Sequence, residues 1–148
     1  MSTDKAVTKD LMTVLEDGRE GFHAAADKLE STDRADLAST FRRLGDQRGQ
    51  FHAELQEMAR AYGDAVDEGG SVAGTLHRGW MAVKDALAGS DPHGVLDAAE
   101  QGEDHAVETY EKALTEDLSV DLRGVVERQL VAVRAAHDEV RALRDTAG

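Results

Sequence analysis

Residues 34–63 have the sequence RADLASTFRRLGDQRGQFHAELQEMARAYG and carry the clearest periodic pattern in the chain. Their apolar members recur at steps of three and four residues, in a nearly regular heptad pattern, which places them on one face of an α-helix. Gly63 is typical of a residue that ends such a helix. The stretch therefore predicts a long amphipathic helix whose apolar face packs against other helices.

The same pattern returns on both sides of this stretch. Residues 5–30, 92–114 and 119–145 predict three more long helices, and residues 72–89 predict a shorter one. The sequence has no run of alternating apolar and polar residues bounded by hairpin turns, so we expect no strands. Because the chain has 148 residues, it suits one domain, residues 1–148, of the all-α class.

The connections between the long helices predict the topology. Short turns near residues 32 and 118 predict two antiparallel helix pairs. Residues 64–91 link the pairs, and a helix of about 18 residues within them would span about 27 Å, enough to return the chain along the bundle. We therefore predict a ferritin-like four-helix bundle with a long crossover connection that contains a shorter helix. A cytokine-like bundle and a pair of isolated coiled-coil hairpins are the alternatives.

The composition limits the kinds of partner. Asp and Glu number 30 against 17 Lys and Arg, a formal net charge of -13, which repels nucleic acid and anionic lipid surfaces. The chain has no cysteine, which excludes disulfides, thiolate zinc sites and cysteine nucleophiles. The charged N-terminal residues resemble neither a signal peptide nor a membrane span. We expect a cytoplasmic protein that binds neither nucleic acid nor membranes.

Several polar residues occupy positions that the helical repeat assigns to the core. Arg48 continues the apolar series of the second long helix, and Glu103 does the same in the third. A buried guanidinium needs an anion, and counting from the turns puts both residues near the middle of the bundle. We predict a buried polar layer with members from all four long helices: Asp17, Arg48, Glu103, Gln129 and His137.

Short phrases around these polar residues stand out along the chain. They are residues 17–22 (DGREGF), 47–55 (QRGQFHAEL), 70–80 (GSVAGTLHRGW), 100–104 (EQGED), His137 and residues 143–145 (LRD). Together they resemble an uncharacterised bacterial ferritin-like family that carries the label "domain of unknown function". The resemblance covers nearly the whole chain and implies a four-helix ferritin-like bundle. It implies no activity, substrate or partner.

The predicted layer departs from a di-iron centre in two of its four helices. Di-iron carboxylate bundles place one Glu on each of two helices and Glu-x-x-His on each of the other two. Arg48 stands where the second helix would need a carboxylate, and Arg134 stands three residues before His137, where the fourth would need Glu. The pattern favours a structural ion-pair layer. A single or degenerate iron or manganese site is the alternative, with these ligands: Asp17, Glu100, Glu103 and His137.

The remaining expectations concern function and association. Trp80 shares the spacing of the apolar residues in the predicted crossover helix, so we expect Trp80 and His77 to pack against the bundle. We expect no catalytic residues and no cofactor. The expected function is that of a non-catalytic, structural or stress-associated protein that forms a homodimer. The alternative is a metal-dependent oxidase or peroxidase, or an iron-handling protein.

Overall fold

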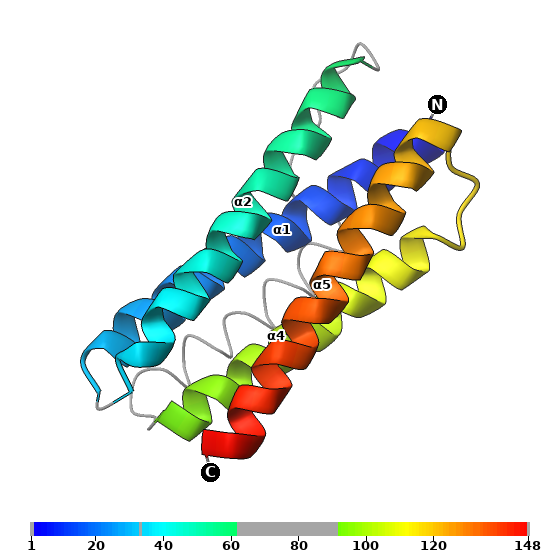
Figure 1. Ribbon diagram of the computed structural model, residues 1–148. Coiled ribbons are helices and arrows are strands. Elements are labelled where there is room, and N and C mark those ends of the chain that lie inside the picture. The colour runs from blue at the N-terminus through cyan, green and yellow to red at the C-terminus, as the bar shows by residue number, and fades with distance from the viewer. Residues whose placement is uncertain (1, 33, 62–91, 148) are drawn as a thin grey trace.

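The computed structural model describes residues 2–32, 34–61 and 92–147, and these residues form four helices (Figure 1). The helices are α1 (Ser2–Glu30), α2 (Asp36–Ala61), α4 (Pro92–Ala113) and α5 (Val120–Ala147). No strand occurs in the described ranges, so the prediction of an all-α chain is confirmed there. The predicted crossover helix, with His77 and Trp80, lies outside the described residues.

The four helices pack side by side, each against two neighbours. α1 lies antiparallel to α2, α4 lies antiparallel to α5, and further contacts join α1 to α4 and α2 to α5 (Figure 1). The contacts between the two pairs exclude a structure of two isolated hairpins. α2 and α4 run parallel, so the end of α2 and the start of α4 lie at opposite ends of the bundle.

Side chains at the turns fix where the helices begin. The Thr32 hydroxyl accepts a hydrogen bond of 3.1 Å from the backbone N–H of Arg34, and α2 begins at Asp36, two residues later than predicted. Ser119 caps α5, because its hydroxyl accepts a hydrogen bond of 3.3 Å from the backbone N–H of Leu122. The backbone N–H of Ser119 also donates to the buried carboxylate of Asp4 at 3.0 Å. This bond ties the start of α1 to the turn between α4 and α5.

The apolar core consists of two clusters, one toward each end of the bundle. One cluster contains Phe22 and Phe41, whose rings meet edge to face with centroids 5.6 Å apart. The other contains Leu11, Leu55 and Tyr110. Along α1, α2 and α4 the two clusters are separated by a short stretch that belongs to neither, and this is where the polar layer lies.

Glycine on α2 lets α1 approach closely. A Cβ atom on Gly45 would lie 2.6 Å from Cδ2 and 2.8 Å from Nε2 of His23, and 3.3 Å from the backbone oxygen of Arg19. The same Nε2 lies 3.0 Å from Oδ1 of Asp46, so the imidazole crosses the glycine to reach the next residue. Gly124 on α5 differs, because a Cβ atom there would meet no atom within 4 Å.

The two glycines predict opposite effects of one substitution. Gly124→Ala should raise the free energy of unfolding by about 0.5–1 kcal/mol, because alanine favours the helix and meets no neighbour. The free energy of unfolding of Gly45→Ala should be at least about 1 kcal/mol lower than that of Gly124→Ala, because the new methyl group displaces His23. Urea denaturation of the two variants at equal concentration measures the difference. Equal stabilisation by both would contradict the close contact between α1 and α2.

Candidate functional site

The centre of the site is a buried ion pair between α2 and α4. Arg48 and Glu103 are both 0% exposed. The guanidinium donates from Nη1 to Oε1 of Glu103 at 2.6 Å and from Nη2 to Oε2 at 2.5 Å. This bidentate arrangement matches the planar fork of the guanidinium to the two carboxylate oxygens. The interior charge of Arg48 is therefore neutralised by one carboxylate in good geometry.

Helix α1 closes the site on a third side. The Cζ atom of Arg48 lies 5.3 Å from the ring centroid of Phe22, a cation–π distance. Gly18 lies one turn before Phe22, and a Cβ atom there would touch Nη1 of Arg48 at 3.5 Å and its Cγ at 3.6 Å. The guanidinium therefore packs between the Phe22 ring, the Gly18 backbone and Glu103.

A chain of hydrogen bonds joins the interior to the surface between α2 and α5. The Tyr110 hydroxyl donates to Oε1 of Gln129 at 2.7 Å, and Nε2 of Gln129 donates to Oε1 of Glu54 at 2.9 Å. Glu54 also accepts a hydrogen bond from the exposed guanidinium of Arg128. Gln129 is fully buried, and its amide uses both its oxygen and its nitrogen in this chain. This chain therefore runs from Tyr110 in the interior to solvent through neutral and charged groups.

Burial raises the pKa of the Tyr110 hydroxyl far above its ordinary value. The positive charge of Arg48 opposes this rise, and the negative charges of Glu54 and Glu103 add to it. The Tyr110 hydroxyl stays protonated across the physiological range and acts as a hydrogen-bond donor, not as a proton acceptor.

Two predicted members of the layer lie at its margin. Asp17 on α1 is half-buried, and Oδ2 of its carboxylate is shielded from solvent. His137 lies between α4 and α5, where its Nε2 is 2.5 Å from Oδ1 of Asp104 and its Nδ1 is 3.4 Å from Oδ1 of Asp138. The structure thus buries Arg48, Glu103 and Gln129 and leaves Asp17 and His137 partly exposed, which agrees with their places at the border and the flank of the apolar stripes.

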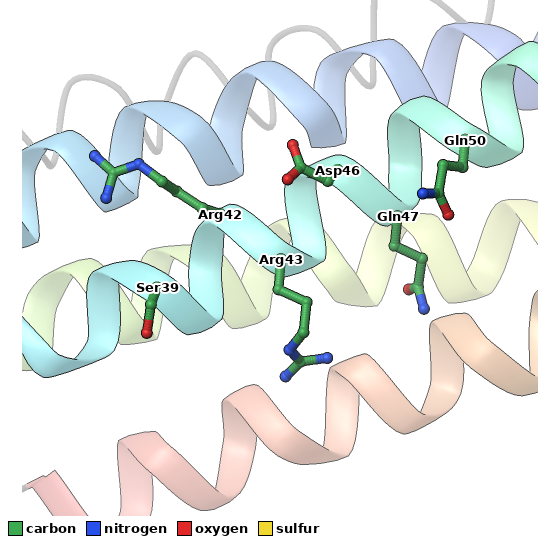
Figure 2. Close-up of a pocket in the computed structure, with 6 residues that line it drawn as sticks. All are labelled: Ser39, Arg42, Arg43, Asp46, Gln47 and Gln50. Carbon is green, nitrogen blue, oxygen red and sulfur yellow. The ribbon is translucent and has the colours of Figure 1, made fainter.

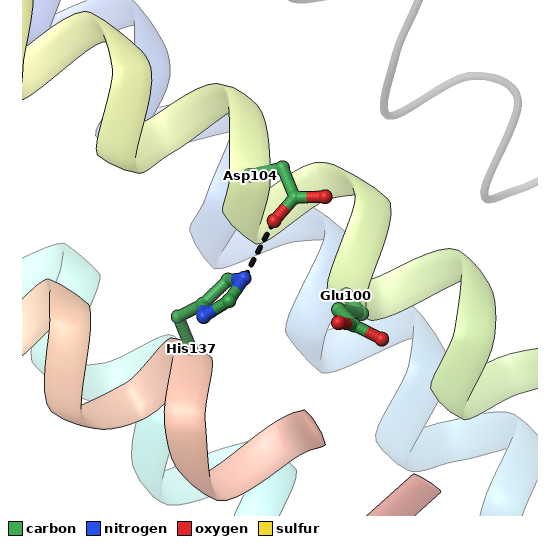
Figure 3. Close-up of side chains that lie close together, drawn as sticks. All are labelled: Glu100, Asp104 and His137. Carbon is green, nitrogen blue, oxygen red and sulfur yellow. Dashed lines mark hydrogen bonds and ion pairs between the residues drawn. The ribbon is translucent and has the colours of Figure 1, made fainter.

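The second group of chemical interest is the cluster of Glu100, Asp104 and His137 (Figure 3). Ligand atoms of these three residues lie within 4.8 Å of one another, and no other such trio occurs in the described part of the chain. Glu100 is buried, and its carboxylate forms ion pairs with Arg141 at 3.0 Å and with Arg144. A cation entering here would have to compete with two guanidinium groups for Glu100.

The predicted metal ligands do not form one group. Glu103 is bonded to Arg48, and Asp17 lies on α1, whereas Glu100 and His137 meet at the surface between α4 and α5. The sequence reasoning missed Asp104, although it follows Glu100 by four residues and so shares its helix face. It also missed Glu54, for which the spacing gives no signal, because Glu54 lies beside the apolar stripe of α2.

A pocket of about 600 Å³ lies on the face of α2 that points away from the core (Figure 2). All six lining residues belong to α2: Ser39, Arg42, Arg43, Asp46, Gln47 and Gln50. The charged residues among them already have partners, because Arg42 bonds to Asp27 and Glu30, Arg43 to Glu139, and Asp46 to His23. The pocket is therefore a polar surface groove and shares no residue with the buried ion pair.

The helices and their buried ion pair define an all-α protein with a charged core. The chain matches the family model "Domain of unknown function (DUF2383)" over residues 6–116 and belongs to that family. The matched range includes most of α1 and all of α2 and α4, and hence both Arg48 and Glu103. No match was found among curated proteins or among solved structures. A search of the described helices found none with the length and apolar character needed to cross a bilayer.

The ion pair makes a direct prediction about stability. Arg48→Met should lower the free energy of unfolding by about 3–5 kcal/mol, because Glu103 would remain buried without a cation. In a Glu103→Gln background the same substitution should cost much less, since no charge is left stranded. Arg60→Met, at an exposed position of α2, is the matched control and should change stability by less than about 0.5 kcal/mol. Urea denaturation measures these changes. Equal losses of unfolding free energy for Arg48→Met in both backgrounds would contradict an ion pair between Arg48 and Glu103.

Tyr110 gives a prediction at alkaline pH. Tyr62→Phe leaves Tyr110 as the remaining tyrosine of the chain. Its folded-state pKa lies above the unfolded value of about 10, so the unfolded state releases this proton first and stability falls as the pH rises above about 10. Tyrosinate absorbance should therefore appear together with the loss of helical circular dichroism. Tyrosinate in a fully helical protein near pH 10 would contradict burial of the hydroxyl.

Proposed function

We propose that the protein is a ferritin-like four-helix bundle that works without a di-iron centre, as a non-catalytic protein in a structural or stress-associated role. The observation that carries this proposal is the bidentate pair of Arg48 and Glu103 at the middle of the bundle, with both side chains removed from solvent. A ferritin-like bundle builds its metal chemistry at this level, from inward-facing carboxylates and histidines.

The course of the helices supports the ferritin-like part of the proposal. α2 and α4 are parallel, which is the arrangement expected of the second and third long helices of a ferritin-like bundle. In an up-down-up-down bundle these two helices would be antiparallel and joined by a short loop. The family membership adds no activity to this description.

The chemistry of the buried groups argues against two metal ions. A di-iron centre needs negative ligands around two divalent cations, and Arg48 adds a positive charge there. Glu103 is the carboxylate best placed to serve such a centre, and both of its oxygens accept hydrogen bonds from Arg48. The residues present therefore do not fit a di-iron site, and no redox step follows from them.

A single divalent cation is the second candidate, and a specific group of residues favours it. Glu100, Asp104 and His137 offer two carboxylates and one imidazole from two helices, a ligand set suited to iron or manganese. Arg141 and Arg144 oppose it, because they already neutralise Glu100. If a cation does bind, these arginines must move away from the carboxylate, and the site would hold an ion at the edge of the bundle instead of its centre.

Metal analysis separates the two candidates. We expect protein purified without chelator to contain no stoichiometric metal, and its melting temperature to stay unchanged after addition of Fe(II) or Mn(II), because nothing binds only the folded state. Stoichiometric metal that is lost in Glu103→Ala would contradict the proposal and point to a central site.

A cation bound by Glu100, Asp104 and His137 would give a different result in the same metal analysis. One ion per chain, lost in His137→Ala and retained in His93→Ala, would replace the first candidate by the second. His93 is an exposed histidine at the start of α4, so its substitution controls for the loss of an imidazole alone.

A further inference from the structure

The outward face of α5 carries a second heptad pattern, distinct from the one that faces the core. Its positions repeat in steps of four and three, and every residue is exposed: Gly124, Arg128, Val131, Ala135, Asp138 and Ala142. Such spacing is typical of a helix that packs against another helix through a narrow seam. We call this set the α5 stripe. The buried residues of α5 lie on its opposite side, and Arg128 of the stripe reaches α2 through its ion pair with Glu54.

The α5 stripe also contains a large apolar side chain that is exposed to solvent. Val120 and Val131 are the large hydrophobic residues that are exposed in the described part of the chain, at 87% and 68%, and both belong to α5. Val131 sits at the middle of the stripe, between Arg128 and Ala135. A Cβ atom on Gly124 would have no neighbour within 4 Å, so a second backbone can approach closely there.

We propose that the α5 stripe is the surface on which a second copy of this chain docks, with the two α5 helices antiparallel about a two-fold axis at residue 133. A two-fold interface must be self-complementary, so that if residue i meets residue j, then j also meets i. In this register Val131 meets Ala135 of the other copy, Arg128 meets Asp138, and Gly124 meets Ala142. Every layer therefore pairs apolar or small residues, or opposite charges.

Charge complementarity selects this occupant and this register. Arg128 and Asp138 occur twice in the pair, which gives two ion pairs symmetric about the axis. Glu127 and Arg141 flank the α5 stripe on one side and also carry opposite charges, which suits the antiparallel arrangement. A copy docked in parallel would instead set Arg128 against Arg128 and Asp138 against Asp138, which costs free energy.

The bonds within one chain leave these charges available. Arg128 uses one N–H on Glu54, and a guanidinium has five N–H donors. The side chain of Arg128 is 56% exposed, and that of Asp138 is 77% exposed. Arg134 lies beside the proposed axis, where its copy would repel it, but Glu111 already bonds it at 2.7 Å. One helix pair buries a small area, so we expect weak association that is seen at high protein concentration.

Charge reversal tests the register in solution. By sedimentation equilibrium at concentrations up to about 1 mM, the chain should approach twice its mass of 15.9 kDa. Arg128→Glu sets Glu against Asp138, and Asp138→Lys sets Lys against Arg128, so each variant alone should be a monomer. An equimolar mixture of the two should form a heterodimer, because the pairing of Arg128 with Asp138 returns at one end and that of Glu with Lys at the other. Glu108→Lys, an exposed charge reversal on α4, should dimerise like the unaltered chain.

The oligomeric states of these variants can be distinguished from a failure to fold and from a failure of the proposed function. Circular dichroism should show that each variant keeps its helices, and recovery on mixing cannot come from an unfolded chain. A monomer for the unaltered protein at every concentration would overturn the inference. So would a dimer that persists in both single variants, or a mixture of the two that remains monomeric. None of these results depends on whether the bundle binds a metal.

Discussion

The structure depends on placing one guanidinium in the middle of an apolar bundle. A cation in such a position is stable only with a matched anion and well-made hydrogen bonds, and Glu103 supplies both at 2.6 and 2.5 Å. The apolar clusters lie on either side of this pair and do not run through it. The pair therefore fixes which residues of α2 and α4 stand level with each other, because a shift by one turn would bury two unpaired charges.

The same constraint shapes the neighbouring groups. α1 can pass beside Arg48 because it presents Gly18 and the face of Phe22 there. Tyr110 and Gln129 extend the polar layer toward α5 and use their hydrogen-bonding groups on each other and on Glu54. Tyr110 and Gln129 thus satisfy each other, whereas Nε of Arg48 is buried without a hydrogen-bond partner. Direct bonds between side chains therefore hold most, but not all, of the buried polar groups.

Helical periodicity was enough to predict the four helices and the burial of Arg48 and Glu103, because both depend only on a rotation of about 100° per residue. It could not predict how the acids near Arg48 divide their roles, since that depends on the distance between helices and on side-chain length. His137 illustrates a second limit. The helical repeat places it at the flank of the apolar stripe of α5, but the repeat does not identify Asp104 on α4 as its partner.

A crystal structure of the protein after soaking with Mn(II), with anomalous scattering data to locate the metal, would show directly whether the ion pair or a metal occupies the middle of the bundle. We expect the guanidinium of Arg48 in the interior, held by both oxygens of Glu103, with no anomalous peak at that height. An Arg48 side chain turned toward solvent, or two peaks bridged by carboxylates at that height, would contradict this expectation.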